Sequence, residues 1–332
     1  MNIQPAAWHC AGFSVSRKRA MRASVTVRVA GSTSNLGAGF DCVGVAIARW
    51  LRVTARADER HGGRAVAIQR AGTLQALDIP PEADLVYQGF AAACRRAGRD
   101  VPVGLSLATD SEIPVARGLG SSAAATVAGA AAAAALLTLP LDPAGLAELC
   151  TEVEGHPDNV APAVYGGATL VLREPRRGGG EAGLAVAALP IHESLALVFA
   201  VPDFTVETKR ARAALPATLP HADAVRAAAK SAALVHGLAH ADPRLLAAAF
   251  DDVLHVPFRR PLVPGYDEVT GAARQAGAFG ATLSGSGPTL VAVAPLGVAP
   301  AVGDAMVRAW RARGTVAETF HTARPAGGVE LD

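Results

Sequence analysis

The chain has 332 residues, of which 51% are apolar and 18% are charged, and its formal net charge is +2. This composition is that of a globular protein and excludes an intrinsically disordered chain. The near-neutral charge gives no electrostatic basis for nucleic-acid binding, which needs a strongly basic surface. A chain of this length can bury a large core in one or two domains.

The cysteines and the N-terminus indicate the cellular setting. Cys10, Cys42, Cys94 and Cys150 are scattered and show no CxxC spacing. Zinc sites and disulfide frameworks need clustered or paired cysteines, so we predict reduced, buried thiols in a cytoplasmic protein. In residues 1–20 the basic residues follow a weakly apolar stretch, which is the reverse of a secretory signal. We expect this segment to be a disordered extension.

The first half of the chain predicts strands followed by helices. Ser24–Ala30, Trp50–Ala57 and Val101–Leu107 alternate polar and apolar residues, as half-buried strands do. A helix is expected at Asp84–Ala97. A second helix is expected in the alanine-rich run Ala123–Leu139. Because alanine favours helices but is only weakly hydrophobic, we predict a buried helix here rather than a membrane span.

The second half alternates in a similar way. Asp142 before Pro143 predicts the N-cap and first turn of a helix that runs to about Glu154. Later strands are expected at 168–172, 195–201, 281–283 and 289–294, and helices at 222–239, 243–253, 265–275 and 300–313. Strands with interspersed helices, rather than strict βαβ alternation, favour an α+β fold. A boundary between residues 178 and 195 predicts domains at 21–185 and 186–332.

The most informative segment for function is a glycine-bearing loop before the alanine-rich helix. It consists of Pro114, Val115, Ala116, Arg117, Gly118, Leu119, Gly120, Ser121, Ser122 and Ala123. The glycines let backbone N–H groups approach an anion, and the helix adds free N–H groups and the positive end of its dipole. Serine hydroxyls can bind phosphate or a bridging metal. The loop therefore predicts an ATP phosphate site, and the alternative is a turn that only caps a helix.

This loop has neither the lysine of a Walker A motif nor the GxGxxG spacing of a dinucleotide-binding fold. Charge neutralisation would therefore fall to the helix dipole, to Mg²⁺ and to Arg117. Two further glycine-rich segments accompany it, at 31–41 (GSTSNLGAGFD) and at 280–289 (GATLSGSGPT). In this order the three segments resemble the motifs of the GHMP kinases, the family of galactokinase and of homoserine, mevalonate and phosphomevalonate kinases.

This resemblance spans residues 24–294 and implies an ATP-dependent kinase with an α+β GHMP kinase fold. Its N-terminal domain would be like ribosomal protein S5 domain 2, and its C-terminal domain would be ferredoxin-like. The residue sequences of these motifs resemble those of homoserine kinases in particular. STSNLGAGFD is close to their STANLGPGFD, with Ala38 in place of the usual proline. The segments EGHPDNVAP (154–162), PDFTVETKRAR (202–212) and FRRPLVPG (258–265) are also similar to theirs.

The homoserine kinase resemblance implies L-homoserine as the substrate, a role in threonine biosynthesis, a homodimer and a cytoplasmic location. Homoserine is a zwitterion, so its carboxylate needs a guanidinium fork and its ammonium needs a carboxylate. Arg212 and Arg259 can supply the first, and Asp41 can supply the second. The predicted substrate-binding residues are Asn35, Asp41, His156, Thr208, Arg212, Arg259, Ser284 and Gly285.

Each of these residues also has an ordinary structural explanation. Arg259 and Arg260 can form a solvated surface pair, while Asn35 and Asp41 are turn-forming residue types. A histidine before a proline, as at position 156, can simply satisfy a turn. The joint pattern, rather than any single residue, favours the substrate site.

For the chemistry, the predicted Mg²⁺ ligands are Ser122 and Glu154, with Glu152 as the alternative carboxylate. The predicted catalytic residues are Asp158, Asn159, Thr208 and Arg212. Mevalonate-type relatives carry an aspartate as base, whereas homoserine kinases have an asparagine near that place. We therefore expect Asn159 to orient the substrate hydroxyl and Asp158 to act through local polarity, since phosphoryl transfer depends mainly on positioning.

The nucleotide base is less well specified. Asp84 stands where relatives often have asparagine, and an ionised carboxylate only accepts hydrogen bonds, so the adenine contacts stay open.

Two alternatives remain for the function of the whole chain. One is a GHMP kinase for mevalonate, a methylerythritol derivative or shikimate, which would not jointly need Thr208, Arg212 and Arg259. The other is a catalytically silent nucleotide-binding regulator, which we would expect to lose the glycine–serine loop or the metal carboxylate.

Overall fold

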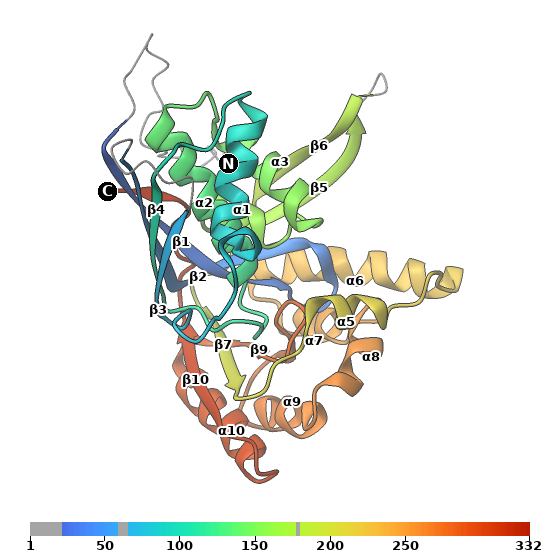
Figure 1. Cartoon of the computed structure of the whole chain (residues 1–332). Coiled ribbons are helices and arrows are strands. Elements are labelled where there is room, and N and C mark those ends of the chain that lie inside the picture. The colour runs from blue at the N-terminus through green and yellow to red at the C-terminus, as the bar shows by residue number, and fades with distance from the viewer. Residues whose placement is uncertain (1–21, 59–65, 177–179) are drawn as a thin grey trace.

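The N-terminal part of the protein is built on a branched sheet (Figure 1). A computed structural model describes residues 22–58, 66–176 and 180–332 of the chain. The sheet has seven strands, with β11-β1-β2-β4-β3 along its main path and β5 and β6 branching from β2. Its strands are β1 (Ser24–Asn35), β2 (Gly39–Ala57), β3 (Ala67–Gly72), β4 (Leu105–Ser111), β5 (Ala168–Arg176), β6 (Gly180–Ala188) and β11 (Glu330–Leu331).

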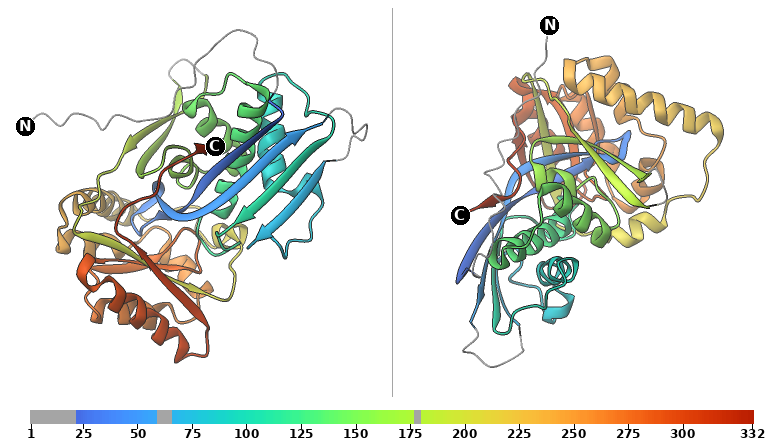
Figure 2. Two further views of the ribbon diagram at one scale, coloured as in Figure 1. Left: turned by 90° about the vertical axis from the view of Figure 1, so that its left-hand side faces the viewer. Right: turned by 90° about the horizontal axis from the view of Figure 1, so that it is seen from above.

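The pairing in this sheet is antiparallel except between β3 and β4. The long strand β2 creates the branch, because residues 51–57 pair with β4 whereas residues 43–45 pair with β5. Helices lie on one face of the sheet, and the left view of Figure 2 shows the other face. They are α1 (Leu85–Arg96), α2 (Ser121–Leu137), α3 (Pro143–Glu154) and α4 (Val160–Tyr165).

Helix α2 is the central helix of this part, and its small residues explain how it packs. Residues 123–137 are all buried, and α2 contacts β1 and β2 as well as the helices α1, α3 and α4. A methyl group at Gly129 would lie 1.9 Å from the carbonyl oxygen of Val86, and one at Gly89 would lie 2.1 Å from that of Thr126. Alanine and glycine thus let α1 and α2 pack backbone against backbone. The prediction of a buried alanine-rich helix is confirmed.

The C-terminal part has a second sheet of four strands in the order β10-β7-β9-β8. Along the chain this is the order 4-1-3-2 of a βαββαβ unit, so the predicted ferredoxin-like topology is confirmed. Its strands are β7 (Leu195–Pro202), β8 (Gly280–Leu283), β9 (Leu290–Pro295) and β10 (Ala317–Thr322). Its helices are α5 (Thr208–Ala213), α6 (His221–His240), α7 (Pro243–Phe250), α8 (Val256–Arg259), α9 (Tyr266–Gln275) and α10 (Ala299–Arg311).

The two parts share one core, and the end of the chain links them again. Leu197, Phe199 and Val293 of the second sheet are buried in the same apolar cluster as the N-terminal strands and helices. After β10 the chain returns to the first sheet, where Ala326 hydrogen-bonds to Ala46 and β11 pairs with β1. The two parts are therefore joined both by a shared core and by the returning end of the chain. Among the described residues, no helix combines the length and apolar character needed to span a bilayer.

Most of the predicted elements are present, with differences at their ends. The predicted strand at Val101–Leu107 is β4, which begins and ends later. The predicted strand at 168–172 extends to Arg176 as β5, and β6 follows from Gly180, with 177–179 outside the described residues. Cys94 and Cys150 are buried free thiols as predicted, whereas Cys42 is half-buried. Cys10 and the predicted disordered extension at 1–20 lie outside the described residues.

Candidate active site

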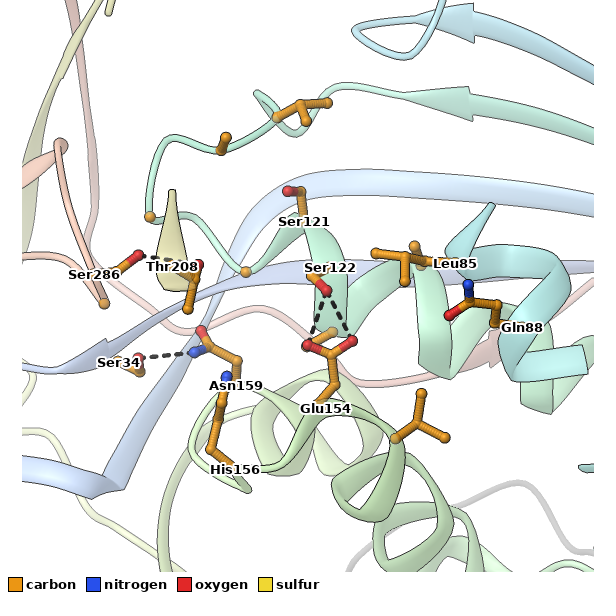
Figure 3. A pocket seen from close by; sticks show the side chains of 18 of the residues that line it. Ser34, Leu85, Gln88, Ser121, Ser122, Glu154, His156, Asn159, Thr208 and Ser286 are labelled. Atoms are coloured by element: carbon orange, nitrogen blue, oxygen red, sulfur yellow. Dashed lines mark hydrogen bonds between the residues drawn. The ribbon is translucent and has the colours of Figure 1, made fainter. Parts of the chain in front are cut away.

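A cavity of about 530 Å³ lies between the two parts of the molecule. One end is apolar and is lined by Leu74, Leu77, Ile79, Leu85 and Val115. The other end is polar and is lined by Ser34, Asn35, His156, Asp158, Asn159, Thr208, Arg212 and Arg259. Figure 3 shows Ser121, Ser122 and Glu154 between the two ends. The cavity therefore offers an apolar slot and a charged pocket on opposite sides of the glycine–serine loop.

The three glycine-rich segments meet at this loop. Gly118 and Gly120 have φ angles of 74° and 69°, in the left-handed region that favours glycine. A methyl group at Gly118 would lie 2.3 Å from the carbonyl oxygen of Ser284, and one at Gly120 would lie 2.1 Å from Ser32 Oγ. Backbone hydrogen bonds join Ser32 to Leu119 and Gly285 to Ser34. Segments from three distant parts of the sequence thus form one assembly.

The loop presents backbone N–H groups to the cavity. Gly120 is the N-cap of α2 and contributes no side-chain cap, so the first N–H groups of this helix have no side-chain acceptor. The lining residues from the loop are Val115, Ala116, Gly118, Gly120, Ser121, Ser122 and Ala123. The free N–H groups and the dipole of such a helix start are suited to an anion.

Arg117 contacts backbone carbonyls at the end of β7. Its guanidinium donates hydrogen bonds to the carbonyl oxygens of Pro202 and, at 2.8 Å, of Asp203. Pro114, Arg117 and Leu119 are not among the residues that line the cavity. The charge of Arg117 is thus held against the end of β7, and neutralisation of phosphate by Arg117 stays a prediction.

Ser284 also differs from the prediction of a direct substrate contact. It is completely buried and outside the cavity lining. Its hydroxyl donates a 2.6 Å hydrogen bond to the Gly118 carbonyl and lies 2.8 Å from Thr33 Oγ1, from which it can accept. It therefore holds the loop in place from behind. Gly285 does line the cavity, and its carbonyl accepts hydrogen bonds from Asn35 and Arg259.

Of the two candidate metal carboxylates, only Glu154 faces the loop. Its two carboxylate oxygens lie 2.8 and 2.9 Å from Ser122 Oγ, and one of them accepts a 2.7 Å hydrogen bond from Thr126. Glu152 instead forms an exposed ion pair of 2.7 Å with Arg96. An all-oxygen pair of one carboxylate and one hydroxyl beside a phosphate loop suits Mg²⁺, which completes its coordination with phosphates and water.

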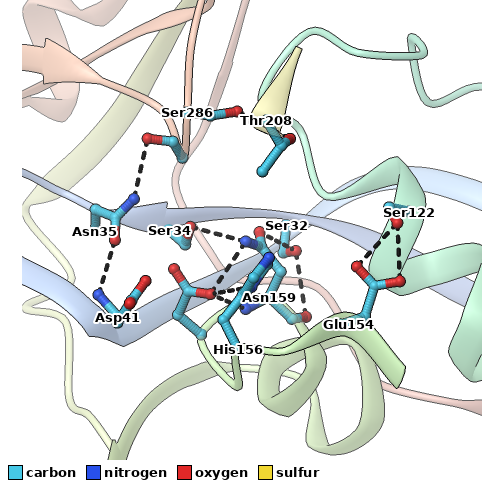
Figure 4. A network of polar contacts seen from close by, with 12 residues as sticks. Ser32, Ser34, Asn35, Asp41, Ser122, Glu154, His156, Asn159, Thr208 and Ser286 are labelled. Carbon is cyan, nitrogen blue, oxygen red and sulfur yellow. Dashed lines mark hydrogen bonds and ion pairs between the residues drawn. The ribbon is translucent and has the colours of Figure 1, made fainter. Parts of the chain in front are cut away.

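A network of hydrogen bonds fixes the amide of Asn159 at the polar end (Figure 4). Its Nδ2 donates to Ser34 Oγ at 2.9 Å, and its Oδ1 accepts from Ser32 Oγ at 2.9 Å. Both serines belong to the first glycine-rich segment. The amide orientation is thus set by two hydroxyls, and Asn159 lines the cavity. No role was predicted from the sequence for Ser32 or Ser34.

Asp158, which is buried, and His156, which is half-buried, form a pair beside Asn159. His156 Nδ1 lies 2.9 Å from Asp158 Oδ1. Burial acts to raise the pKa of Asp158, but the hydrogen bonds of His156 and Ser34 and the charges of His156 and Arg212 together outweigh burial and lower it. Burial likewise acts to lower the pKa of His156, and its hydrogen bond and attraction to Asp158 raise it overall. The pair therefore favours an ionised Asp158, which suits a polar support better than a proton acceptor.

The ionic groups predicted to hold the amino acid lie at the same end, but two of them contact each other. Arg212 and Asp41 form a bidentate ion pair with N–O distances of 2.9 and 3.1 Å. The backbone N–H of Asp41 donates to Asn35 Oδ1 at 2.9 Å. Asp41 is outside the cavity lining, whereas Arg212 lines it. The Asp41 carboxylate is thus occupied by Arg212, which is the member of the pair that lines the cavity.

Arg259 is a buried cation without a carboxylate partner among the described residues. It is 2% exposed, which rules out the solvated surface pair, and Arg260 alone pairs at the surface with Asp267. Its hydrogen bonds go to neutral acceptors, namely Ala211 O, Gly285 O and His255 Nδ1. Burial and the charge of Arg212 lower the pKa of Arg259 to about 10. A buried cation of this kind is stabilised by an anionic ligand.

Thr208 and Asp84 mark the two ends of the cavity. Thr208 is the first residue of α5, and its hydroxyl lies 3.4 Å from Ser286 Oγ (Figure 3). Asp84 is the N-cap of α1, where one carboxylate oxygen accepts from Val86 N and the other pairs with Arg70 at 2.9 Å. Asp84 therefore lines the cavity while it stabilises the start of the helix.

Thr126 and the apolar wall were not predicted from the sequence. Thr126 lies four residues after Ser122 on α2, so the i, i+4 spacing of a helix could have placed both hydroxyls on one face. Leu74, Leu77 and Ile79 lie in a segment without strand or helix periodicity, and nothing in the local pattern indicates that they line a cavity.

We predict that Asn159→Ala lowers kcat at least about tenfold, which corresponds to roughly 1.4 kcal/mol of barrier. The variant removes the amide held by Ser32 and Ser34 at the polar end of the cavity. Asp158→Asn removes the charge that holds His156 and is expected to lower kcat as well. Steady-state kinetics of both variants provide the test. If neither change lowers kcat by about tenfold, these two assignments are wrong.

The family comparisons agree with this geometry. The model of the GHMP kinases N terminal domain matches residues 84–167, and that of the GHMP kinases C terminal matches residues 234–312. A homoserine kinase from Trichormus variabilis is 40% identical over 292 residues, which cover 88% of this chain and 93% of that protein. A homoserine kinase from Moorella thermoacetica is 40% identical over 87% of this chain and 93% of its own length.

A solved structure leads to the same family. The crystal structure of homoserine kinase from Cytophaga hutchinsonii has a TM-score of 0.81 and 29% identity, and the match covers 96% of this chain and 100% of that one. The first matched domain contains the glycine–serine loop, Glu154 and Asn159, and the second contains Arg259 and Ser284. Relatives at this identity and coverage, together with the matched two-domain fold, establish that the chain belongs to the homoserine kinases of the GHMP kinase family.

Proposed function

We propose that the protein transfers the γ-phosphate of ATP to the hydroxyl of L-homoserine, giving O-phospho-L-homoserine, in threonine biosynthesis. The observation that carries this proposal is one cavity with a helix-start anion site in its middle and a buried, carboxylate-free guanidinium at its polar end. An ATP-dependent kinase needs the first feature. An amino-acid acceptor explains the second, because its carboxylate can neutralise Arg259.

For the nucleotide, we assign the triphosphate to residues 118–122 and the base to the apolar end. The free N–H groups at the start of α2 bind phosphate oxygens, and the hydroxyls of Ser121 and Ser122 add donors. Ser122 and Glu154 would hold Mg²⁺, which supplies positive charge to the phosphates when bound. Thr126 orients the Glu154 carboxylate by its hydrogen bond.

For the acceptor, we assign the carboxylate of homoserine to Arg259 and Arg212, and its ammonium to Asp41 and Asn35. The ion pair of Arg212 with Asp41 supports this assignment, because a zwitterion inserted between them gives each side chain a new partner of opposite charge. No charge is then left unpaired in the occupied site. An acceptor with only a carboxylate, such as mevalonate, would leave Asp41 without the cation that it now holds.

For the reaction, the side chains of this site mainly position the acceptor. Asn159, held by Ser32 and Ser34, directs the homoserine hydroxyl toward the γ-phosphate, and Thr208 adds a neutral hydrogen bond from α5. Asp158 stays ionised beside His156 and contributes a fixed field. Because the transition state of phosphoryl transfer is loose, alignment of the hydroxyl matters more than early removal of its proton.

Neither alternative is favoured by the site. Mevalonate, a methylerythritol derivative or shikimate would not need Asp41, Arg212 and Arg259 together. A catalytically silent regulator would have no need to preserve Ser122, Glu154 and Thr126 as one hydrogen-bonded group. We further propose a homodimer in the cytoplasm, with an N-terminal domain at 21–185 and a C-terminal domain at 186–332.

The proposal is tested by an ATP-consumption assay across homoserine, serine, threonine, mevalonate and shikimate, with the phosphorylated product identified by mass. We expect kcat/KM to be at least about tenfold higher for homoserine than for any other acceptor. Turnover of mevalonate without turnover of homoserine would overturn the choice of acceptor. Binding of ATP without any turnover would favour the regulator.

A further inference from the structure

A buried histidine lies directly behind the guanidinium of Arg259. His255 is completely buried at the N-cap of α8, and Arg259 lies at the end of the same short helix. His255 does not line the cavity. Its Nδ1 lies 3.4 Å from Arg259 Nη1, and its Nε2 lies 3.0 Å from the carbonyl oxygen of Gly37. One ring thus contacts both the arginine and the first glycine-rich segment.

These two contacts define the state of the imidazole. A carbonyl only accepts, so Nε2 must carry the hydrogen that is donated to Gly37, and a guanidinium only donates, so Nδ1 must accept from Arg259. Only the neutral Nε2–H tautomer meets both conditions. Burial and the nearby charge of Arg259 favour this form by lowering the pKa of His255 to about 4, against the opposing charge of Asp252.

The surroundings leave the ring little freedom. Asp252 accepts hydrogen bonds from the backbone N–H groups of Leu254, His255 and Val256, which fixes the turn that carries the histidine. Phe40 stacks on the imidazole with ring centroids 4.9 Å apart, and it also lies 5.0 Å from the guanidinium carbon of Arg259. An acceptor held this firmly restricts the rotation of the Arg259 side chain.

We propose that His255 is a positioning residue for the amino-acid half of the site. It orients Arg259 toward the acceptor carboxylate and connects Arg259 to the turn at Gly37 through its two ring nitrogens. This inference rests on the proposed function. Arg259 also donates to the backbone carbonyls of Ala211 and Gly285 at 3.3 Å each, and the 3.4 Å contact of its Nη1 with His255 adds an acceptor on a ring that Phe40 holds in place. The Gly37 contact also matters, because Asn35 and Asp41 flank that turn and belong to the same half of the site.

The test compares His255→Leu with His255→Asn. Leucine fills similar space but removes both contacts, whereas asparagine keeps a carbonyl oxygen near the position of Nδ1 that can accept from Arg259. We expect the KM for homoserine to rise about tenfold in H255L with the KM for ATP within about twofold, and H255N to recover most of the loss. A folded H255L enzyme with unchanged KM for homoserine would overturn the proposal. So would equal changes in both KM values that asparagine does not relieve.

A second measurement separates action through Arg259 from a general loss of packing. If His255 acts through Arg259, H255L should add little to the KM for homoserine of Arg259→Gln, so the two changes are not additive. Additive effects on KM would contradict the proposal.

The wild-type enzyme in the same assay tests the proposed function separately. Absence of homoserine turnover there removes the acceptor assignment, whereas normal wild-type turnover with unaffected variants removes only the role of His255.

Discussion

Replacing Glu154 by glutamine is expected to lower kcat/KM for ATP about 100-fold, which corresponds to roughly 2.7 kcal/mol of transition-state stabilisation. The change keeps the size of the side chain but removes the charge that lies 2.8 and 2.9 Å from Ser122. The concentration of Mg²⁺ that gives half-maximal activity should rise in parallel, because the proposed metal pair loses its only charged member. Initial rates over a grid of ATP and Mg²⁺ concentrations measure both effects.

Glu152→Gln is the matched control. Glu152 lies on the same helix two residues earlier, but it is paired with Arg96 at the surface, so its loss should change kcat/KM by less than about twofold. If the Glu152 variant showed the larger loss of activity and the larger shift in Mg²⁺ dependence, the carboxylate assignment would be reversed. Equal, small effects of both variants would remove the metal site from this position.

Gly120→Ala is expected to lower kcat/KM for ATP by about 100-fold, through both a higher KM for ATP and a lower kcat. A methyl group there would lie 2.1 Å from Ser32 Oγ and 2.9 Å from the backbone nitrogen of Ser32. The loop would have to move away from the place where its N–H groups converge. Because Ser32 also holds the amide of Asn159 at 2.9 Å, the disturbance would reach the acceptor side as well.

Gly167→Ala separates this collision from simple backbone strain. Gly167 has a φ angle of 70°, nearly equal to the 69° of Gly120, but a methyl group at this position would meet nothing within 4 Å. Both variants should therefore lose roughly 1–2 kcal/mol of stability from the left-handed conformation. Only Gly120→Ala should lose activity. Similar steady-state kinetics for the two variants would show that the loop tolerates a side chain at position 120, and would contradict a phosphate site built on its backbone.

The elements that the sequence predicted well have local signals. Asp142 caps α3 through a 2.8 Å hydrogen bond to Gly145 N, and Gly155 ends the same helix in the left-handed conformation. Both features follow from the capping preferences of single residues. The glycine–serine loop could also be predicted from local sequence, because free N–H groups at a helix start are a consequence of local geometry. Such features can be predicted without knowing the fold.

Features that depend on distant contacts could not be predicted in the same way. The ion pair of Arg212 with Asp41 joins residues 171 positions apart, and each side chain was predicted to hold a different end of the substrate. Arg117 was assigned to phosphate by its position in the loop, but the fold places backbone carbonyls of Pro202 and Asp203 within its reach. In both cases residue type and neighbourhood were informative, but the partner was set by how the two domains pack.

The short elements show the same limit. Helix α5 has only six residues and was not predicted, although it carries both Thr208 and Arg212. Isolated helices of this length are unstable in water, so α5 depends on contacts with the rest of the protein. Its sequence pattern is correspondingly weak. Resemblance to homoserine kinase motifs identified these two residues, whereas periodicity alone did not.

The central claim is that nucleotide and amino acid occupy the two ends of one cavity with the phosphate loop between them. The most direct test is a crystal structure of the protein with Mg²⁺, a non-hydrolysable ATP analogue and L-homoserine. We predict phosphates on the backbone of residues 118–122, the carboxylate of homoserine on Arg259, and its hydroxyl between Asn159 and the γ-phosphate. Phosphates bound away from the start of α2, or homoserine bound outside the polar end of the cavity, would contradict this claim.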